Sequence, residues 1–276
     1  MNAIEYANRA SKLFAVPETA TKIKHLSDSG SAQMRDIARV VSSDPGLAAH
    51  VLKLANSAVY RFSRKIEDLE KAIQIIGVNS VYEFALAFAV SDSLTKEHYK
   101  YIDVKKYWFQ SLSCALFCRE IAKICHEKDG SRLFMAGLFH NIGELAVLRI
   151  NPTLARDCGR FNATKFPKTV QQELLGFGYA EISASLLQKW LLPDSIVSTV
   201  AMQHHDESPA VTQEIQILQL AYTLSMIITY PDLYDLELFV PEFLYTSLNI
   251  SSEEIDSVIN KVRTETEKTV HLFVDH

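Results

Sequence analysis

The residues best suited to chemistry are two pairs of polar side chains in or near apolar segments. His140 and Asn141 stand side by side in the stretch 133–147, which is otherwise almost wholly apolar, and His204 and His205 form a second pair. Histidines and carboxylates from separate helices can hold a divalent metal ion that activates a water to attack a phosphate ester. Asn141 would contribute only a neutral amide to such a site.

The spacing of the second pair limits what it adds. Adjacent residues on a helix point about 100° apart, so we expect at most one of His204 and His205 to face the same cavity as His140. Polar groups inside a core are often structural and hydrogen-bonded. From the residues alone, core or capping histidines are therefore favoured over a metal site.

Two other kinds of chemistry find no support in the sequence. Cys125 and His126 are adjacent, and neighbours on a helix do not face each other, so a cysteine nucleophile is rejected. The chain lacks the serine-hydrolase pattern Gly-x-Ser-x-Gly and the phosphate-binding patterns Gly-x-x-x-x-Gly-Lys-Ser/Thr and Gly-x-Gly-x-x-Gly. The pair Gly176 and Gly178 is interpreted as a turn between helices.

Composition narrows the class of protein. The 276 residues carry a net charge of -5, which disfavours nucleic-acid binding because phosphates require a basic surface. The most apolar run, 84–90, is far shorter than the ~20 residues of a membrane-spanning helix, and the N-terminus does not resemble a signal peptide. The four cysteines form no Cys-x-x-Cys pair and are interpreted as core residues in a reducing compartment. We expect a cytoplasmic protein.

Hydrophobic periodicity predicts an all-α fold, because apolar residues recur at helical spacing and no segment alternates as a strand would. Asp44 followed by Pro45 is a typical helix start. Capping boxes are expected where serine is followed three residues later by glutamate, at Ser80 and at Ser251. Helices are also expected over about 104–126, 133–147 and 153–161. The polar segment 91–106 predicts a boundary between an N-terminal lobe (1–95) and a C-terminal lobe (96–276).

The sequence resembles the HDOD family, bacterial signalling domains related to the metal-dependent HD phosphohydrolases. The resemblance covers about residues 5–230. The motifs that carry it, in chain order, are VSSDPGL (41–47), LKLANSAVY (52–60), AIQIIGV (72–78), YWFQS (107–111), AGLFHNIG (136–143), GFGYAE (176–181), LLQKW (186–190), LPD (192–194) and QHH (203–205). It implies a two-lobed helical bundle whose C-terminal lobe is HD-like, extended by C-terminal helices.

The resemblance also assigns positions to the HD metal ligands. The His-Asp doublet falls on His140 and Asn141, which keeps the histidine and loses the carboxylate. The distal histidine matches His204 or His205. Three further ligand positions carry other groups: Gln110, Tyr179 and Tyr222. Without these donors the chain is expected to bind no metal tightly and to need no cofactor.

The resemblance therefore implies a signal-transduction protein without catalytic activity, which binds a partner protein or a small ligand in a cleft between its lobes. Gln110, His140, Asn141, Tyr179, His204 and His205 are its candidate cleft residues. The alternative is a phosphohydrolase acting on a nucleotide or cyclic dinucleotide, with a divalent metal at His140 and His204. No attached receiver, kinase, cyclase or DNA-binding module is recognised, so the input is expected from another chain.

The residues of the first lobe that most resemble the family are Asp44, Pro45, Asn56 and Ser57. Here we favour helix capping over ligand contact. Asp44 would satisfy free amides at a helix start, and Asn56 would close a helix end in left-handed geometry.

Overall fold

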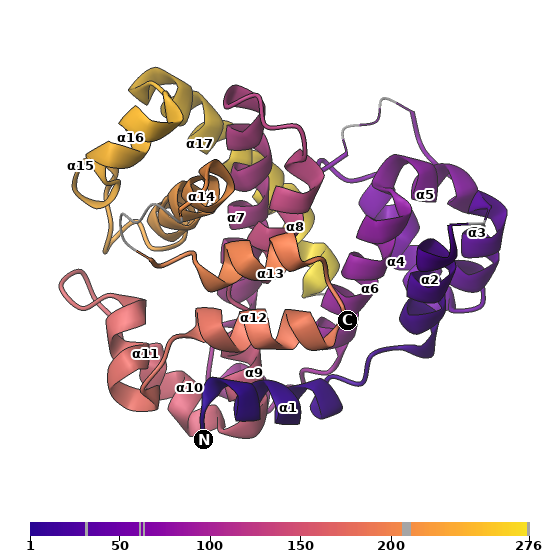
Figure 1. Ribbon diagram of the computed structural model, residues 1–276, viewed down its shortest axis with the longest axis horizontal. Helices are drawn as coiled ribbons and strands as arrows, with labels where there is room; N and C mark the ends of the chain where they lie inside the picture. Colours follow the sequence, from indigo (N-terminus) through magenta and orange to yellow (C-terminus); the bar gives the residue numbers. More distant parts are fainter. Residues whose placement is uncertain (31–32, 61, 63, 206–210, 275–276) are drawn as a thin grey trace. The chain divides into compact units, whose positions relative to one another are not determined.

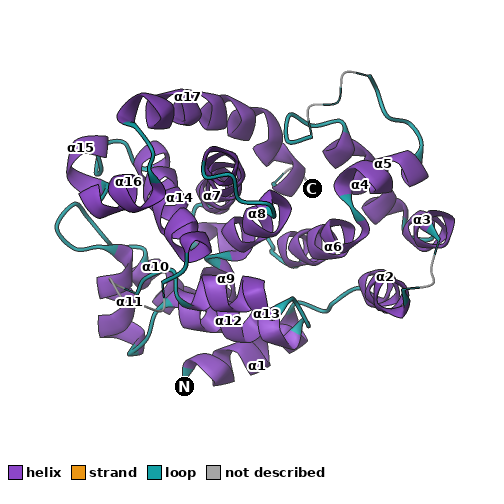
Figure 2. Cartoon of the chain, turned by 45° about the horizontal axis from the view of Figure 1, so that its top comes forward, coloured by secondary structure: helices purple, strands orange, loops and turns teal. Residues whose placement is uncertain are grey.

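The computed structural model describes residues 1–30, 33–60, 62, 64–205 and 211–274, and all regular secondary structure in these ranges is helical (Figure 2). The prediction of an all-α fold is confirmed. The chain forms two compact units. The larger unit comprises Met1–Leu13 and Leu94–Thr266, and the smaller unit comprises Phe14–Ser93 and the chain from Glu267 onward. These units differ from the expected lobes 1–95 and 96–276. The first helix belongs to the larger unit, with the later part of the chain, and the last residues belong to the smaller unit, with the earlier part.

The smaller unit is a cluster of short helices around an apolar core. Its elements are α2 (Glu18–Ser29), α3 (Met34–Ser42), α4 (Pro45–Ala55), α5 (Leu69–Ile76), α6 (Val78–Asp92) and the 3-10 turn η2 (Val270–Phe273). α6 packs against α2, and α5 packs against α3 and α4. The ring of Phe88 lies between those of His50 and Phe273, at centroid distances of 4.1 and 5.1 Å. These aromatic contacts hold the C-terminal turn within this unit.

The larger unit is built around the longest helix of the described chain. Its elements are α1 (Ala3–Leu13), η1 (His98–Lys100), α7 (Val104–Ile124), α8 (Gly130–Phe139), α9 (Ile142–Ile150), α10 (Pro152–Cys158), α11 (Pro167–Leu175), α12 (Tyr179–Lys189), α13 (Asp194–Ala201), α14 (Gln213–Thr229), α15 (Leu236–Phe239), α16 (Glu242–Leu248) and most of α17 (Ser252–Thr269). α8 and α14 pack along α7, while α1 lies along α12 (Figure 1). Ion pairs from Glu120 to Lys261 and from Arg119 to Glu265 join α7 to α17.

Two predicted helix starts are confirmed, and one was wrong. Asp44 Oδ1 accepts the Leu47 N–H at 3.0 Å, and Pro45 is the first residue of its helix. Ser251 and Glu254 form the expected capping box: the Ser251 N–H donates to Glu254 Oε2 at 2.9 Å, and the Glu254 N–H donates to Ser251 Oγ at 3.2 Å. The box expected at Ser80 is absent, because α6 already begins at Val78. Gly77, at φ 87°, ends α5 and directly precedes α6, where it takes the N-cap position without a side-chain cap.

Two helices are shorter than expected. The helix expected over 104–126 ends at Ile124 because His126 adopts a left-handed backbone at φ 55°. The helix expected over 153–161 ends at Cys158, ahead of Gly159.

Asn56 differs from its predicted role. Its backbone is right-handed, at φ −90°, so it does not close the helix in left-handed geometry. Its side-chain amide instead donates to the carbonyls of Leu52 and Ile66 at 2.8 and 2.7 Å and accepts the Ile66 N–H at 2.8 Å. Asn56 therefore fastens the loop at Ile66 to the end of α4.

The apolar stretch around His140, predicted as one helix, is two helices. α8 ends at Phe139, α9 begins at Ile142, and His140 and Asn141 form the break between them. Close packing on both sides requires glycine. A Cβ on Gly137 would lie 2.7 Å from Ala115 Cα, and one on Gly143 would lie 2.3 Å from Tyr179 O. The segment that contains the break therefore packs closely against α7 on one side and α12 on the other. His140 and Asn141 lie in the break, so the polar pair does not stand in the middle of a helix.

The segment Gly130–Ile150, which includes this break, is the one single candidate for a membrane span in the described residues. Gly130–Ile150 is long and apolar enough by composition, but 78% of the 18-residue window that qualifies lies buried inside the protein. The pair α5 and α6 would qualify only together, and it is bent by 96°. Burial of this kind is typical of a core segment in a soluble protein.

Candidate functional site

His140 is a neutral imidazole held in the core of the larger unit. Its side chain is 1% exposed, and its Nδ1 donates to Gly137 O at 2.7 Å. Burial lowers the pKa of His140 to about 4, an effect that this bond only partly offsets. Since Nδ1 carries the hydrogen, Nε2 is left as an acceptor, and it is buried without a hydrogen-bond partner.

Asn141 directs its amide at a carboxyl that the sequence analysis did not single out. Its Nδ2 donates to Glu144 Oε2 at 2.6 Å, one helical turn further on. Burial raises the pKa of Glu144 to about 7, while the bond from Asn141 acts in the opposite direction. Glu144 therefore holds its proton for much of the time at neutral pH. The three-residue spacing from Asn141 within an apolar helix was the signal that could have identified it.

Most of the predicted site residues line one cavity, here called the inner cavity, inside the larger unit. Gln110, Asn141, Tyr179, His204 and Tyr222 all line it. The other lining residues are Glu144, Cys158, Gly159, Phe161, Pro167, Gln171, Met226 and Tyr230. Residues from α7, α9, α11, α12 and α14 thus converge on this cavity, whereas His140 and His205, the other two predicted cleft residues, do not line it.

Tyr222 packs against two imidazoles. Its ring centroid is 5.6 Å from that of His140 and 4.9 Å from that of His204, and both pairs are edge-to-face. Burial raises the pKa of the Tyr222 phenol, so the group is neutral. Burial also lowers the pKa of His204, aided by the positive charge of Lys168. The imidazoles of His140 and His204 and the phenol of Tyr222 are therefore all uncharged, so none of them supplies the negative charge that a bound metal ion would need.

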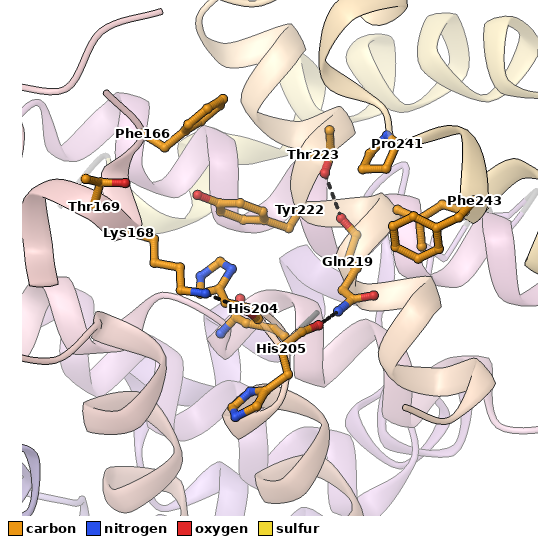
Figure 3. A pocket seen from close by; sticks show the side chains of 12 residues that line it. Phe166, Lys168, Thr169, His204, His205, Gln219, Tyr222, Thr223, Pro241 and Phe243 are labelled. Atoms are coloured by element: carbon orange, nitrogen blue, oxygen red, sulfur yellow. Dashed lines mark hydrogen bonds between the residues drawn. The ribbon is translucent and has the colours of Figure 1, made fainter. Parts of the chain in front are cut away.

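The second histidine pair opens onto a larger space, here called the outer pocket, of about 660 Å³ in the larger unit (Figure 3). His204 lines both cavities, whereas exposed His205 lines only the outer pocket. The remaining lining residues come from α11 and α16 with the residue that precedes each, from α14 and from the turn after α13: Phe166, Lys168, Thr169, Gln203, Gln219, Tyr222, Thr223, Pro241, Phe243 and Leu244. Lys168 Nζ donates to His204 O at 2.6 Å and so links α11 to this turn.

The donors around the inner cavity do not suit a divalent metal ion. Within the described ranges, no three His, Cys, Asp or Glu side chains are grouped closely enough to hold one. The ionisable lining groups besides His204 and the tyrosines are the carboxyl of Glu144 and the thiol of Cys158, and burial raises the pKa of both. Each would have to lose a proton to bind a cation, at a cost that burial increases.

The first-lobe motif residues lie in the smaller unit and make local hydrogen bonds there. Besides capping α4, Asp44 accepts a bond of 3.1 Å from Thr19 Oγ1. Ser57 Oγ donates to Leu54 O at 2.7 Å. These bonds fix the ends of α4.

Comparison with known proteins gives the chain its context. The sequence matches the family model of the HDOD domain over residues 13–206. A Shewanella amazonensis SB2B structure, whose name proposes a phosphohydrolase, is 20% identical with a TM-score of 0.73 and covers 99% of this chain and 98% of its own. An HDOD domain protein of unknown function from Geobacter sulfurreducens is 19% identical, with a TM-score of 0.67 and coverage of 92% of both chains.

Two longer relatives match in part. A Marinobacter aquaeolei VT8 structure, whose name proposes a role in signal transduction, is 22% identical with a TM-score of 0.71; the match covers 94% of this chain and 59% of that one. An uncharacterized protein from Treponema pallidum (strain Nichols) is 23% identical over 206 residues, which is 74% of this chain. The present chain spans 40% of the length of that curated relative. At these identities the structures establish a shared fold.

Proposed function

Because the chain belongs to the HDOD family, we propose that it is a non-catalytic regulatory protein that acts by binding a partner protein or a small ligand. The observation that carries this proposal is the set of groups lining the inner cavity. Gln110, Asn141, Tyr179 and Tyr222 occupy positions where the HD pattern has metal ligands, and each is neutral. A dication would have to be held by imidazoles and amides, or by the Glu144 carboxyl and the Cys158 thiol after each had lost a proton at a cost that burial increases.

The cavities support binding in place of catalysis. The outer pocket is within the size range of small-molecule sites, and aromatic and apolar side chains form much of its wall. It lies wholly within the larger unit, so a ligand bound there requires no contribution from the smaller one. The smaller unit would then offer its surface to a protein partner, in keeping with the signalling role proposed by the name of the Marinobacter relative.

We also place the protein in the cytoplasm. All four cysteines are free thiols, and Cys114, Cys118 and Cys158 are buried. Free buried thiols are typical of a reducing compartment.

A metal-dependent phosphohydrolase is the second candidate, and one observation favours it. The unpartnered Nε2 of His140 is the nitrogen a metal would use, and His204 contacts the same Tyr222 ring that His140 contacts. Both imidazoles are neutral, as metal ligands must be.

Phosphodiesterase and phosphomonoesterase assays separate the two candidates. The purified chain is assayed with p-nitrophenyl phosphate and bis-p-nitrophenyl phosphate after incubation with Mn²⁺, Fe²⁺ or Mg²⁺. His140→Ala serves as the test variant, and His25→Ala, which removes an exposed histidine of the smaller unit, serves as its control. We expect no turnover above the buffer rate in any sample. Turnover that requires metal, survives in His25→Ala and disappears in His140→Ala would establish the enzyme.

A further inference from the structure

The outer pocket combines an apolar wall with a wall that carries one cation. Pro241, Phe243 and Leu244 come from the start of α16. Figure 3 shows Pro241 and Phe243 on the opposite side of the pocket from Lys168, with the ring of Tyr222 between them. Among the described lining residues, Lys168 is the one Lys, Arg, Asp or Glu side chain. A ligand in this pocket therefore meets mainly hydrocarbon on one side and an ammonium group on the other.

Phe166 adds a flat aromatic surface that the fold holds in place. It is 45% exposed, although large apolar side chains are usually buried. Its ring stacks on that of Tyr234 at a centroid distance of 6.0 Å and meets the ring of Phe239 edge to face at 5.4 Å. These contacts fix the ring while part of it stays exposed at the pocket, where it suits a flat apolar group of a ligand.

The polar side chains of the apolar part of the pocket are already engaged within the protein. The Nε2 of Gln203 donates to His140 O at 2.9 Å, and that of Gln219 donates to His205 O at 2.7 Å. The Oε1 atoms of both glutamines are buried, out of reach of a ligand in the pocket. The Thr223 hydroxyl donates to Gln219 O at 2.9 Å, within its own helix. These side chains therefore offer a ligand little hydrogen bonding.

This shortage of hydrogen-bonding groups discriminates between two kinds of ring. The polar edges of a nucleobase would lose their bonds to water on entering the pocket without gaining bonds to the protein. Each unsatisfied group would weaken binding about tenfold. A hydrocarbon ring has no such groups to satisfy, so the pocket favours it.

Positive charge is concentrated at the start of α11. The Nζ of Lys168 donates to His204 O at 2.6 Å, which holds the ammonium group at the pocket, and an ammonium has further N–H groups to donate. Lys168 and Thr169 are the second and third residues of α11, where the backbone amides give a helix end partial positive charge. Phe166, at the N-cap position, provides no side-chain cap. An anionic group of a ligand would be stabilised here by both charges.

We propose that the outer pocket binds an aryl carboxylate, with its ring against Phe166, Tyr222 and Phe243 and its carboxylate beside Lys168. The inference rests on the proposed ligand-binding function and names the ligand class. This class differs from the nucleotide of the phosphohydrolase alternative, because its ring has no polar edge. The pocket is separate from the inner cavity apart from the shared His204 and Tyr222.

A ligand series tests the proposal on the unaltered full chain. Isothermal titration calorimetry at physiological ionic strength compares 2-naphthoate with 2-naphthylmethanol, which has the same ring without the charge, and with adenosine 5'-monophosphate, which has the charge on a polar ring. We expect 2-naphthoate to bind about fivefold more tightly than the alcohol, as for one exposed ion pair at a helix end, and about tenfold more tightly than the nucleotide. Equal affinity for 2-naphthoate and the alcohol, a nucleotide that binds as tightly as 2-naphthoate, or no binding of 2-naphthoate at millimolar concentration would overturn the proposal.

One pair of variants locates the carboxylate. Lys168→Met keeps the hydrocarbon stem and removes the charge, so it should weaken 2-naphthoate about fivefold and leave the affinity for 2-naphthylmethanol unchanged. The unchanged affinity for the alcohol also shows that the pocket is intact. Lys189→Met, which changes an exposed lysine outside the pocket, should alter neither affinity. A variant at Lys168 that weakens both compounds equally, or neither, contradicts the position of the carboxylate.

A second pair locates the ring. Phe243→Ser removes one aromatic contact, so it should weaken 2-naphthoate and 2-naphthylmethanol by the same factor, about fivefold. Tyr245→Ser changes an aromatic residue of the same helix that does not line the pocket, and it should leave both affinities unchanged. Loss of affinity in both variants, or in neither, contradicts the site.

Failure of this proposal and failure of the proposed function give different results. A chain that does not bind 2-naphthoate and shows no metal-dependent turnover loses only the ligand class. Metal-dependent turnover removes the non-catalytic function, whatever the calorimetry shows.

Discussion

Replacing Glu144 with glutamine should change the pH dependence of stability in a defined direction. Burial raises the pKa of this carboxyl from 4.5 to about 7 in the folded protein. Below pH 4.5 the group is protonated in both states and favours neither. As the pH rises from 4.5 to about 7, the unfolded chain gives up the proton first, so this carboxyl progressively destabilises the fold. Above about pH 7 both states are ionised and the penalty is constant.

The magnitude follows from the two pKa values. The difference between 4.5 and about 7, at about 1.4 kcal/mol per pH unit, amounts to about 3 kcal/mol. Glutamine has nearly the same shape, can accept the hydrogen bond from Asn141, and has no proton to lose. The variant should therefore match the unaltered protein at pH 4 and be more stable by about 3 kcal/mol at pH 8.

The assay is urea unfolding from pH 4 to pH 8.5, with the variant and the unaltered protein measured side by side. The quantity of interest is the difference between their free energies of unfolding at each pH, because most contributions from the histidines cancel in it. Glu181→Gln, which changes a glutamate outside the inner cavity, is the control, and its difference should vary little over pH 5.5–8.5. A flat difference curve for Glu144→Gln, or one that falls with pH, would refute the burial of an uncharged carboxyl.

Three further substitutions test other parts of the structure. His140→Ala strands Gly137 O in the core, so it should lower the free energy of unfolding by about 1–3 kcal/mol and the Tm accordingly, as measured by calorimetry. Glu120→Gln removes the centre of the ion pairs that join α7 to α17. Burial opposes the charge of Glu120, but those pairs prevail and lower its pKa to about 2. The free energy of unfolding of the variant, measured with urea at pH 7, should therefore be about 3 kcal/mol lower than that of the unaltered protein. This difference should shrink as the pH falls from 4.5 toward 2. Asn56→Ala removes two hydrogen bonds to Ile66 and one to Leu52, so amide hydrogen exchange of Ile66 should accelerate while that of α7 stays unchanged.

Much of the fold could be predicted because its signals are local. The helix start at Asp44 depends on residues within one turn, and the capping box at Ser251 likewise. Boundaries set by other elements could not be predicted. The apolar run around His140 has no Pro at its centre and predicts one helix, yet it breaks where Gly137 and Gly143 let α7 and α12 approach closely.

The candidate site also contains residues that the sequence could identify and residues that it could not. The resemblance to HD proteins identified Gln110, Asn141, Tyr179 and His204, and these residues do line a common cavity. Glu144 was missed because a glutamate on a helix is usually exposed, and its burial depends on the packing of other helices. The occupied amides of Gln203 and Gln219 were invisible for a related reason, since only the folded chain shows which amide atoms already have partners.

The central claim is that neutral groups have replaced the metal ligands of the inner cavity. It is tested most directly by measuring metal content with inductively coupled plasma mass spectrometry, after the protein has been equilibrated with equimolar Mn²⁺, Fe²⁺ and Zn²⁺ and then desalted. The account predicts far less than one metal ion per chain, with the same content in His140→Ala. One ion per chain in the unaltered protein and in His25→Ala, but none in His140→Ala, would contradict it.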